Sequence, residues 1–272
     1  MKIKSLHTLT TKEISTVFME AFEGYFVKMP DDHDYYKERW GAEGVNFEYS
    51  FGMFDESQLV GFILIAVDER FGKKTAFNSG TGVIPSHRGQ RIVQQLYDHA
   101  LPIYKKEGVE KCSLEVIVEN EIAIKAYKKA GMEITKTYKI YSGDLDVPAS
   151  NFELKEIDKS KVEWNSLPNQ KWYSWGYQIP VCRKAENKFY EVWKEGKQVA
   201  YFIFNEATGR IYQVEILENQ SANWEATFAA IQSLKKSVSI VNIDTRRTEL
   251  IDYLEKFSLK NVLDQFEMEM VI

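Results

Sequence analysis

The feature that most constrains the fold is a strand that ends at a proline and is followed by an Arg-Gly turn and a helix. It covers residues 79–93, which read Ser-Gly-Thr-Gly-Val-Ile-Pro-Ser-His-Arg-Gly-Gln-Arg-Ile-Val. Backbone N–H groups in the first turn of a helix have no intrahelical partner and lie at the positive end of the helix dipole, so a phosphate can dock there. Gly89 has no Cβ and lets a ligand approach its backbone. The stretch therefore predicts an anion cradle, with an ordinary strand-to-helix turn as the alternative.

Length and charge narrow the class of protein. The chain has 272 residues, enough for two lobes of ordinary size, and its formal net charge is −5. That charge argues against a nucleic-acid or anionic-membrane partner, because binding phosphates along a polymer or a lipid surface needs a basic face. Cys112 and Cys182 provide neither a disulfide framework nor a CxxC site. With no signal peptide and no run of membrane-spanning length, the sequence predicts a soluble, cytoplasmic protein.

The first half of the chain predicts helices and strands around the cradle. Residues 11–22 have apolar positions at helical spacing behind a threonine cap. Residues 49–54 and 59–67 predict a hairpin, and the second run is continuously apolar, as in a central strand covered on both faces. The helix after the cradle contains Pro102, which should kink or shorten it.

Between the first helix and the hairpin lies an aromatic and acidic segment, residues 23–36. Asp31, Asp32, His33 and Asp34 could be ligands of a hard metal ion, but contiguous acids more often form a solvated helix start in which aspartate caps the helix. The capping interpretation is preferred, and no metal site is predicted.

A second stretch, residues 114–132, combines with the first into a family pattern. It reads Leu-Glu-Val-Ile-Val-Glu-Asn and then Glu-Ile-Ala-Ile-Lys-Ala-Tyr-Lys-Lys-Ala-Gly-Met. Together the stretches resemble the GNAT acyltransferase superfamily, whose patterns are V-x-P-x-x-R-G-x-G-x-G/A and L-x-V-x-x-x-N-x-x-A-x-x-x-Y-x-K-x-G-F. The matching residues are Val83, Pro85, Arg88, Gly89, Leu114, Val116, Asn120, Ala123, Tyr127, Lys129 and Gly131. The departures are Arg91 and Val93, where the family prefers small residues, and Met132 in place of phenylalanine.

The resemblance implies an α/β fold of two tandem GNAT-like lobes, each a mixed central β-sheet flanked by helices. Residues 1–145 would be the catalytic, acetyl-CoA-binding domain, with the CoA pyrophosphate on the backbone of 88–93. The cofactor-binding residues that it implies are Val83, Arg88, Gly89, Gln90, Arg91, Ile92, Val93 and Asn120. The helices between the first two strands form much of the acceptor pocket in this superfamily, so the aromatic segment is a candidate pocket wall or else part of the core.

The chemistry that the resemblance implies is acetyl transfer from acetyl-CoA to an amine of a small molecule or peptide, by direct attack and without an acyl-enzyme. A backbone N–H of 81–83 would meet the oxyanion. Tyr127 would be the general acid for the CoA thiolate, unless it only packs its ring on the core. Glu115 is a candidate base for the acceptor amine, and a solvated strand carboxylate is the alternative. The protein would be a monomer or a homodimer.

Two other functions stay open from the sequence. Arg91 and Val93 are compatible with a CoA-binding sensor or assembly module that has lost turnover. A small-ligand α/β domain unrelated to acyl transfer is a third possibility, and it would bind no CoA at all.

From residue 151 the order of elements repeats without the site residues. A hairpin at 189–204, a strand at 210–216, a helix, a strand at 238–243, another helix and a closing strand follow one another. No Arg-Gly turn follows Ile216, and Leu254 stands opposite Tyr127. Residues 151–272 are therefore predicted to be a degenerate, non-catalytic GNAT-like domain.

The two halves are expected to meet at a polar linker, residues 142–150, which contains both Gly and Pro. An aromatic cluster follows the linker and either walls a pocket or packs in a core, with packing preferred. Its members are Trp164, Trp172, Tyr173, Trp175 and Tyr177.

Overall fold

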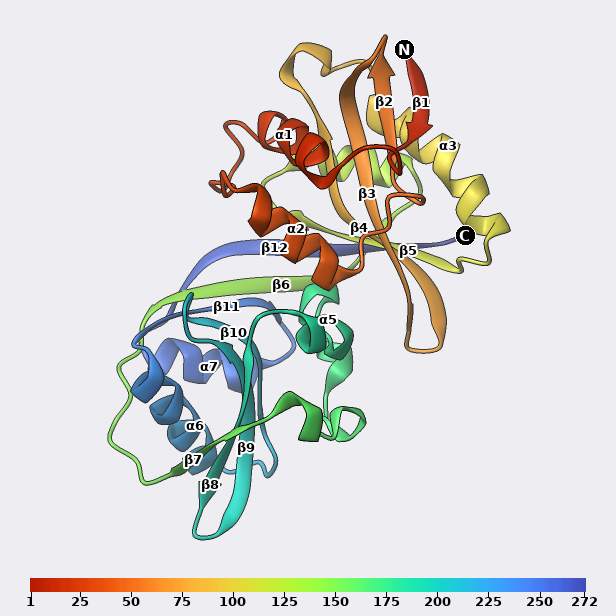
Figure 1. Cartoon of the computed structure of the whole chain (residues 1–272). Coiled ribbons are helices and arrows are strands. Elements are labelled where there is room, and N and C mark those ends of the chain that lie inside the picture. Colours follow the sequence, from red (N-terminus) through yellow and green to blue (C-terminus); the bar gives the residue numbers. More distant parts are fainter. The chain divides into compact units, whose positions relative to one another are not determined.

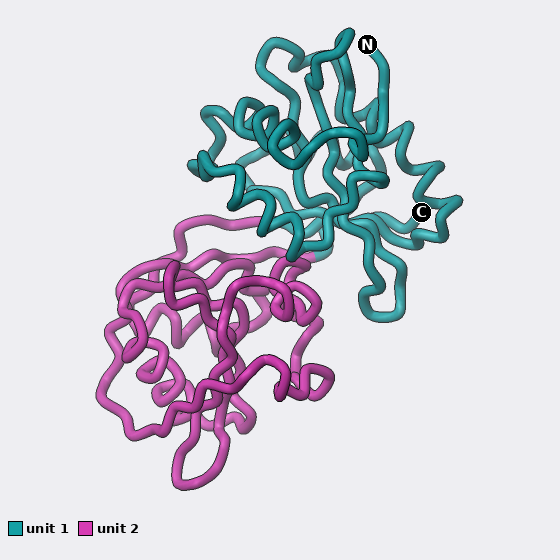
Figure 2. The backbone as a smooth tube through the Cα atoms, in the orientation of Figure 1, with its two compact units in different colours: residues 1–135, 266–272 teal, residues 136–265 magenta.

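The chain divides into two compact units (Figure 2). The computed structural model describes all 272 residues. Unit 1 contains residues 1–135 and 266–272, and unit 2 contains residues 136–265. The expected domains, 1–145 and 151–272, differ from these units because residues 136–145 pack in unit 2 and the last seven residues pack in unit 1. No helix combines the length and the apolar character that crossing a membrane would require.

Unit 1 is a mixed β-sheet with helices on both faces (Figure 1). In sheet order, its strands are β1 (Lys2–Ser5), β2 (Phe51–Asp55), β3 (Gln58–Arg70), β4 (Lys73–Val83), β5 (Lys111–Ile117) and the end of β12 (Lys260–Val271). Its helices are α1 (Thr11–Ala21), α2 (His33–Glu43), α3 (Ile92–Lys106) and α4 (Glu121–Lys129). Helices α1 and α2 lie on one face, and α3 and α4 lie on the other.

The predicted helix starts and the central strand are confirmed. Thr10 caps α1 in a capping box with Glu13. Asp32 caps α2 by accepting a hydrogen bond of 2.9 Å from the backbone N–H of Asp34. Strand β3 is buried over eight consecutive residues. Pro102 lies inside α3 but does not shorten it, since the helix continues to Lys106 before Gly108 turns left-handed.

Two glycines of β4 let α1 approach the sheet closely. A Cβ built on Gly80 would lie 2.7 Å from the ring of Phe18. A Cβ on Gly82 would lie 2.7 Å from the ring of Phe62 and 2.8 Å from the Cβ of Ala21. These distances are shorter than any real carbon contact, so α1 packs directly on backbone here.

Replacing Gly82 with alanine is therefore expected to destabilise the protein by about 1–3 kcal/mol, the usual effect of overpacking. The free energy of unfolding in urea, followed by circular dichroism, measures the change. Gly41→Ala is the matched control, because nothing lies near the Cβ that it adds inside α2, and alanine favours a helix by up to about 1 kcal/mol. Equal stability of Gly82→Ala and wild type would contradict the packing argument.

The last residues of the chain complete unit 1. Met268 of β12 is fully buried in the same hydrophobic core as β3, β4 and α3. The Lys111 ammonium lies 2.7 Å from the Glu269 carboxylate, and the N–H of Ile272 donates to the carbonyl of Glu110. The closing strand predicted at the end of the chain exists, but its end belongs to the first unit.

Unit 2 repeats the layout. Its strands, in sheet order, are β6 (Glu133–Asp144), β11 (Ser237–Asp244), β10 (Arg210–Ile216), β9 (Lys197–Asn205), β8 (Lys188–Lys194) and β7 (Glu153–Ile157). Its helices are α5 (Ile179–Lys184), α6 (Ser221–Leu234) and α7 (Thr248–Lys256). The order of elements inferred from the sequence, a hairpin, a strand, a helix, a strand and a helix, is confirmed.

The stretch expected to be a linker is packed into unit 2. Leu145 and Val147 are buried, and their N–H groups donate to the carbonyl of Lys236 and the side chain of Gln232. The aromatic cluster after it packs as preferred, with Trp164, Tyr173 and Trp175 each only 4% exposed.

Candidate active site

A gap opens in the sheet of unit 1 between β4 and β5. The two strands pair in parallel from Thr75–Lys111 to Asn78–Leu114 and no further. The pairing of β4 with β3 slips by one residue at the same place, where Ser79 forms a β-bulge. Past this point the edges of β4 and β5 do not bond to each other, so a ligand can lie between them and use the backbone groups of β4.

The cradle lies at the end of β4. A single 3₁₀ turn, Pro85–His87, leads into α3, whose first intrahelical bond runs from the N–H of Gln95 to the carbonyl of Arg91. The N–H groups of residues 92–94 come before that bond and therefore have no partner within the helix. Gly89 has a φ of +79°, and nothing lies within 4 Å of the position of a Cβ. The predicted anion cradle has the open backbone that it needs.

Three side chains of the cradle have positions that the sequence pattern did not reveal. The Arg88 guanidinium donates to the carbonyls of Ala21 at 3.0 Å and Val83 at 3.3 Å, so it ties the cradle to the end of α1. Arg91 is exposed, and its backbone is in the left-handed region with a φ of 57°. The family pattern has a small residue at this position, which adopts that conformation more readily. Val93 packs against the core and leaves its N–H at the cradle.

Tyr127 of α4 lies against β4 on the α3 side. Its ring is 8% exposed and meets the ring of Tyr97 edge to face, with 6.1 Å between centroids. Burial raises the pKa of Tyr127 to about 12, and the nearby Thr81 side chain opposes part of that rise. Tyr127 thus lies beside the unpaired part of β4, at the gap.

Asn120 links two elements beside Tyr127. Its Oδ1 accepts from the N–H of Ala123 at 3.2 Å and caps α4. Its Nδ2 donates to the hydroxyl of Tyr25 at 3.3 Å. Burial raises the pKa of Tyr25, a second phenol in the neighbourhood of Tyr127.

Charged groups gather at the gap on the α1 and α2 side. The Arg39 guanidinium pairs with Glu43 at 2.9 Å and donates to the carbonyl of Ser79 at 3.4 Å. The Ser79 hydroxyl donates to the other oxygen of Glu43. Burial alone would lower the pKa of Arg39. The negative charges of Glu43 and, more weakly, Glu115 outweigh this effect, so the pKa of Arg39 is raised. Glu115 is therefore a half-buried neighbour of Arg39 on β5.

The structure thus brings together the backbone from Val83 to Val93 at one end of the gap. Tyr127 lies on the side of α3 and α4. Glu115 lies near Arg39, on the side of α1 and α2. Sequence reasoning missed the polar residues that join them: Asn78, Thr81, Tyr25, Arg39, Glu43 and Ser79. Arg39 and Glu43 carried a signal, since opposite charges four residues apart support a helix. Nothing in the sequence indicated the bulge that turns Asn78 and Thr81 to the same face of the sheet.

Unit 2 has a matching gap. Strands β10 and β11 pair in parallel only at Arg210–Ser239 and Ile211–Ile240. The pairing of β10 with β9 slips at the next residue, Tyr212. The last parallel pair and the following bulge place Ile211 at the position of Asn78, Val214 at that of Thr81 and Glu215 at that of Gly82.

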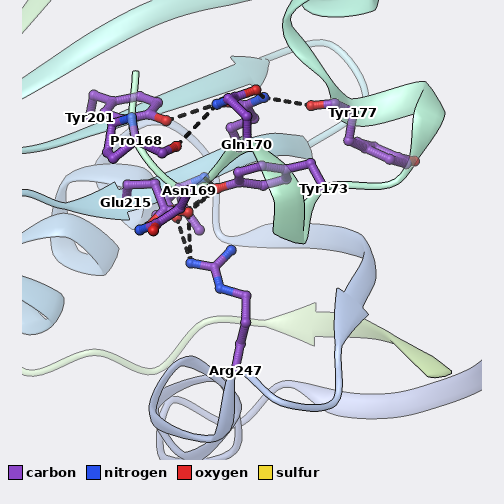
Figure 3. Close-up of polar contacts among 10 residues, drawn as sticks. Pro168, Asn169, Gln170, Tyr173, Tyr177, Tyr201, Glu215 and Arg247 are labelled. Atoms are coloured by element: carbon purple, nitrogen blue, oxygen red, sulfur yellow. Dashed lines mark hydrogen bonds and ion pairs between the residues drawn. The ribbon is translucent and has the colours of Figure 1, made fainter. Parts of the chain in front are cut away.

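The gap in unit 2 is filled by residues 169–177 of the same chain (Figure 3). The Tyr173 hydroxyl accepts the N–H of Val214 at 3.2 Å, on the open edge of β10. Ser174 accepts a hydrogen bond of 2.9 Å from Asn242 on β11. A ligand could reach this backbone only by displacing the segment.

A buried ion pair holds residues 169–177 in place. The Glu215 and Arg247 side chains are 3% and 9% exposed and lie 2.8 Å apart. In Figure 3 Arg247 reaches Glu215 from one side, and Asn169 and Tyr173 reach it from the other. Burial raises the pKa of Glu215, and Arg247 opposes that rise. Unit 2 thus has a carboxylate where unit 1 has a glycine.

Comparisons with known proteins identify a family segment in the first half of the chain. Residues 12–132 match the model of the Acetyltransferase (GNAT) family. This segment contains β4, the cradle, β5 and α4. No curated protein sequence matches the chain.

Solved structures share the fold of the whole chain. A putative acetyltransferase from Pyrococcus horikoshii is 14% identical with a TM-score of 0.74, and the match covers 100% of this chain and 89% of that one. A tandem GNAT protein from the clavulanic acid biosynthesis pathway is 11% identical with a TM-score of 0.68, covering 99% and 98%. A probable N-acyltransferase from Enterococcus faecalis is 17% identical with a TM-score of 0.64, covering 100% and 72%. At these identities the likeness concerns the fold.

Proposed function

Residues 12–132 are a GNAT-family segment within a chain of tandem GNAT fold, and from this premise we propose that the protein is an N-acetyltransferase. It transfers an acetyl group from acetyl-CoA to an amine of a small molecule or peptide by direct attack. Unit 1 does the chemistry, and unit 2 does none. The observation that carries the proposal is the gap between β4 and β5, with an open anion cradle at one end and a phenol at its side.

The placement of groups around the gap supports this reaction. The backbone of Arg88 to Val93 can hold the pyrophosphate of CoA, whose thioester arm would then lie along the unpaired edge of β4. An N–H of 81–83 can donate to the oxyanion. The carboxylates of Glu43 and Glu115 lie on one side and the Tyr127 phenol on the other, as attack by an amine and departure of a thiolate require.

Titration calorimetry with CoA tests the binding part of the proposal. The full chain should bind one CoA, because the gap in unit 2 is filled. Gly89→Asp should weaken CoA at least about tenfold, since it adds bulk and negative charge where the pyrophosphate lies. Gly41→Ala should bind as wild type does. Two sites per chain would contradict the role of unit 2, and unchanged affinity in Gly89→Asp would contradict the cradle.

Release of the CoA thiol with a panel of amines tests the reaction. Acetyl-CoA should give thiol only when a suitable amine is present. Binding of acetyl-CoA without amine-stimulated release would favour the second candidate, a CoA-binding sensor or assembly module, for which the exposed and left-handed Arg91 is the specific observation.

Glu115 is the proposed base for the acceptor amine. An alkylamine with a pKa near 10.4 is neutral only about 0.04% of the time at pH 7, a deficit of roughly 4.6 kcal/mol. Glu115→Gln is expected to lower turnover at pH 7 about tenfold, below the usual effect because Glu43 remains nearby, and to shift the rise of the pH–rate profile toward the pKa of the amine. Glu119→Gln, an exposed carboxylate just after β5, should leave the profile unchanged. A wild-type profile in Glu115→Gln would leave Glu115 only as a partner of Arg39.

A further inference from the structure

Ser79 is the extra residue of the bulge in β4. Leu64 of β3 pairs with Gly80 and Ile65 pairs with Asn78, so Ser79 has no partner residue across the ladder of β3 and β4. The polar groups of a bulged residue leave the ladder and then need other partners. Ser79 is only 6% exposed, so these partners have to come from the protein itself.

Two charged residues of α2 hold Ser79 in place. The Arg39 guanidinium donates to the Ser79 carbonyl at 3.4 Å, and the Ser79 hydroxyl donates to one carboxylate oxygen of Glu43. The other oxygen of Glu43 accepts from Nε of Arg39 at 2.9 Å, which closes a ring of hydrogen bonds. Charge-assisted hydrogen bonds are roughly twice as strong as neutral ones. Arg39 and Glu43, the α2 clamp, thus grip the bulge by its main chain and by its side chain.

Asn78 holds the bulge from the opposite face of the sheet. Its Oδ1 accepts from the N–H of Gly80 at 2.9 Å, and its Nδ2 donates to the hydroxyls of Thr81 at 2.5 Å and Tyr97 at 2.6 Å. Residues three apart in a regular strand point to opposite faces, so Asn78 reaches Thr81 because of the extra residue between them. These contacts belong to the bulged form of β4.

Unit 2 supports its own bulge differently. Its extra residue is Tyr212, whose ring packs on Tyr177 of the filling segment with 5.6 Å between centroids. At the positions of the polar pair on β4 stand Ile211 and Val214, both apolar and buried. The filled gap is therefore supported by the segment that fills it, whereas the bulge beside the open gap is held by polar and charged side chains.

We propose that Arg39 and Glu43 are positioning residues that fix the Ser79 bulge and so hold the unpaired edge of β4, residues 81–83, in place for the thioester of the donor. The inference rests on the proposed function, in which an N–H of 81–83 meets the oxyanion. It gives α2 a part in the geometry of the strand that binds the donor. A preorganised N–H needs no rearrangement during the reaction, so loss of the α2 clamp should lower kcat rather than raise KM.

Steady-state kinetics of the full chain with acetyl-CoA and an accepted amine tests the α2 clamp. Ser79→Ala and Glu43→Gln should each lower kcat about tenfold, less than the roughly 10²- to 10³-fold loss of an oxyanion donor itself, and leave the KM for acetyl-CoA within about twofold. The double variant should lose no more than Glu43→Gln alone, because the Ser79 hydroxyl and Glu43 form one contact. Glu38→Gln, an exposed carboxylate of the same helix, is the control and should match wild type.

Ser79→Ala also distinguishes positioning by Glu43 from proton transfer by Glu43. It leaves every carboxylate of the site charged, so it should lower kcat by the same factor at pH 6 and at pH 9. Wild-type turnover in Ser79→Ala together with a loss in Glu43→Gln would assign Glu43 to the chemistry itself and overturn the proposal.

Hydrogen exchange of the free protein, followed by NMR, separates this inference from the proposed function. The Gly80 amide, which donates to Asn78, should exchange about fivefold faster in Ser79→Ala than in wild type. The Ile84 amide, which donates to the carbonyl of Val60 beyond the bulge, should exchange as in wild type. Unchanged exchange at Gly80 overturns the inference but leaves acyl transfer standing. Failure of the wild type to release thiol from acetyl-CoA with any amine overturns the proposed function, and the inference with it.

Discussion

Tyr127→Phe is expected to lower the turnover of acetyl transfer on the order of 10²-fold, with little change in the affinity for acetyl-CoA. The substitution keeps the ring that packs on Tyr97 and removes only the hydroxyl. Burial holds the pKa of Tyr127 near 12, so giving its proton to a thiolate whose acid has a pKa near 8.5 is uphill by about 3.5 units, or roughly 4.8 kcal/mol. The phenol therefore contributes a hydrogen bond that strengthens as charge grows on sulfur, and the loss is at the low end for acid–base assistance.

The loss should be independent of pH across the working range. The phenol stays protonated up to a pH near its pKa of about 12, so Tyr127→Phe should reduce kcat by the same factor at pH 6 and at pH 9. Single-turnover measurement makes the chemical step visible. Tyr104→Phe is the control, because Tyr104 is another buried phenol of unit 1 whose hydroxyl donates to the carbonyl of Tyr49 away from the gap. Wild-type single-turnover rates in Tyr127→Phe would leave only a packing role.

Arg247→Leu is expected to destabilise unit 2 by about 3–5 kcal/mol at pH 8, the effect of leaving a buried charge without its partner. Glu215, whose side chain is 3% exposed, would keep only the neutral partners Asn169 and Tyr173. Unfolding in urea followed by tryptophan fluorescence reports mainly on unit 2, because five of the six tryptophans, all except Trp40, lie in residues 136–265.

The pH dependence of that loss has a definite sign. Burial already raises the pKa of Glu215, and removing Arg247 removes a charge that lowers it, so the folded pKa should rise further above the unfolded value. A group with a raised folded pKa contributes stability that is present below the unfolded pKa and is lost as pH rises through the folded pKa. The destabilisation should therefore be smaller at pH 5 than at pH 8.

Two further variants keep this prediction testable if Arg247→Leu folds poorly. Arg247→Leu with Glu215→Gln removes both charges and should recover stability and lose the extra pH dependence. Lys188→Leu breaks an exposed pair with Glu156 and should leave the urea midpoint unchanged. A loss in Arg247→Leu that is equal at pH 5 and pH 8 would mean that Glu215 is not the charge left behind.

Much of unit 1 could be predicted from the sequence because its signals are local. The capping residues, the apolar run of β3 and the turn around Gly89 each express a preference of a few neighbouring residues. The positions of Arg88 and Asn78 could not be predicted in this way. Arg88 is held by the carbonyl of Ala21, 67 residues away, and the environment of Asn78 depends on a bulge that exists only when β3 and β4 pair.

The sequence also could not predict which strands pair with each other. Alternation along residues 260–271 predicts a strand, but it contains no information about which sheet the strand joins. Burial of Met268 and the pair between Lys111 and Glu269 settle the end of that strand in unit 1. For the same reason the sequence could show that an Arg-Gly turn is missing after Ile216, but not that Tyr173 fills the gap there.

The return of the last seven residues to unit 1 sets an order for assembly on the ribosome. All of unit 2, residues 136–265, emerges before Phe266, so it can fold while unit 1 still lacks its sixth strand and the buried Met268. Translation proceeds from the N-terminus, but the N-terminal unit is the one that must wait. Unit 2 is thus contiguous in the sequence, whereas the core of unit 1 can close only after residues on both sides of unit 2 have been made.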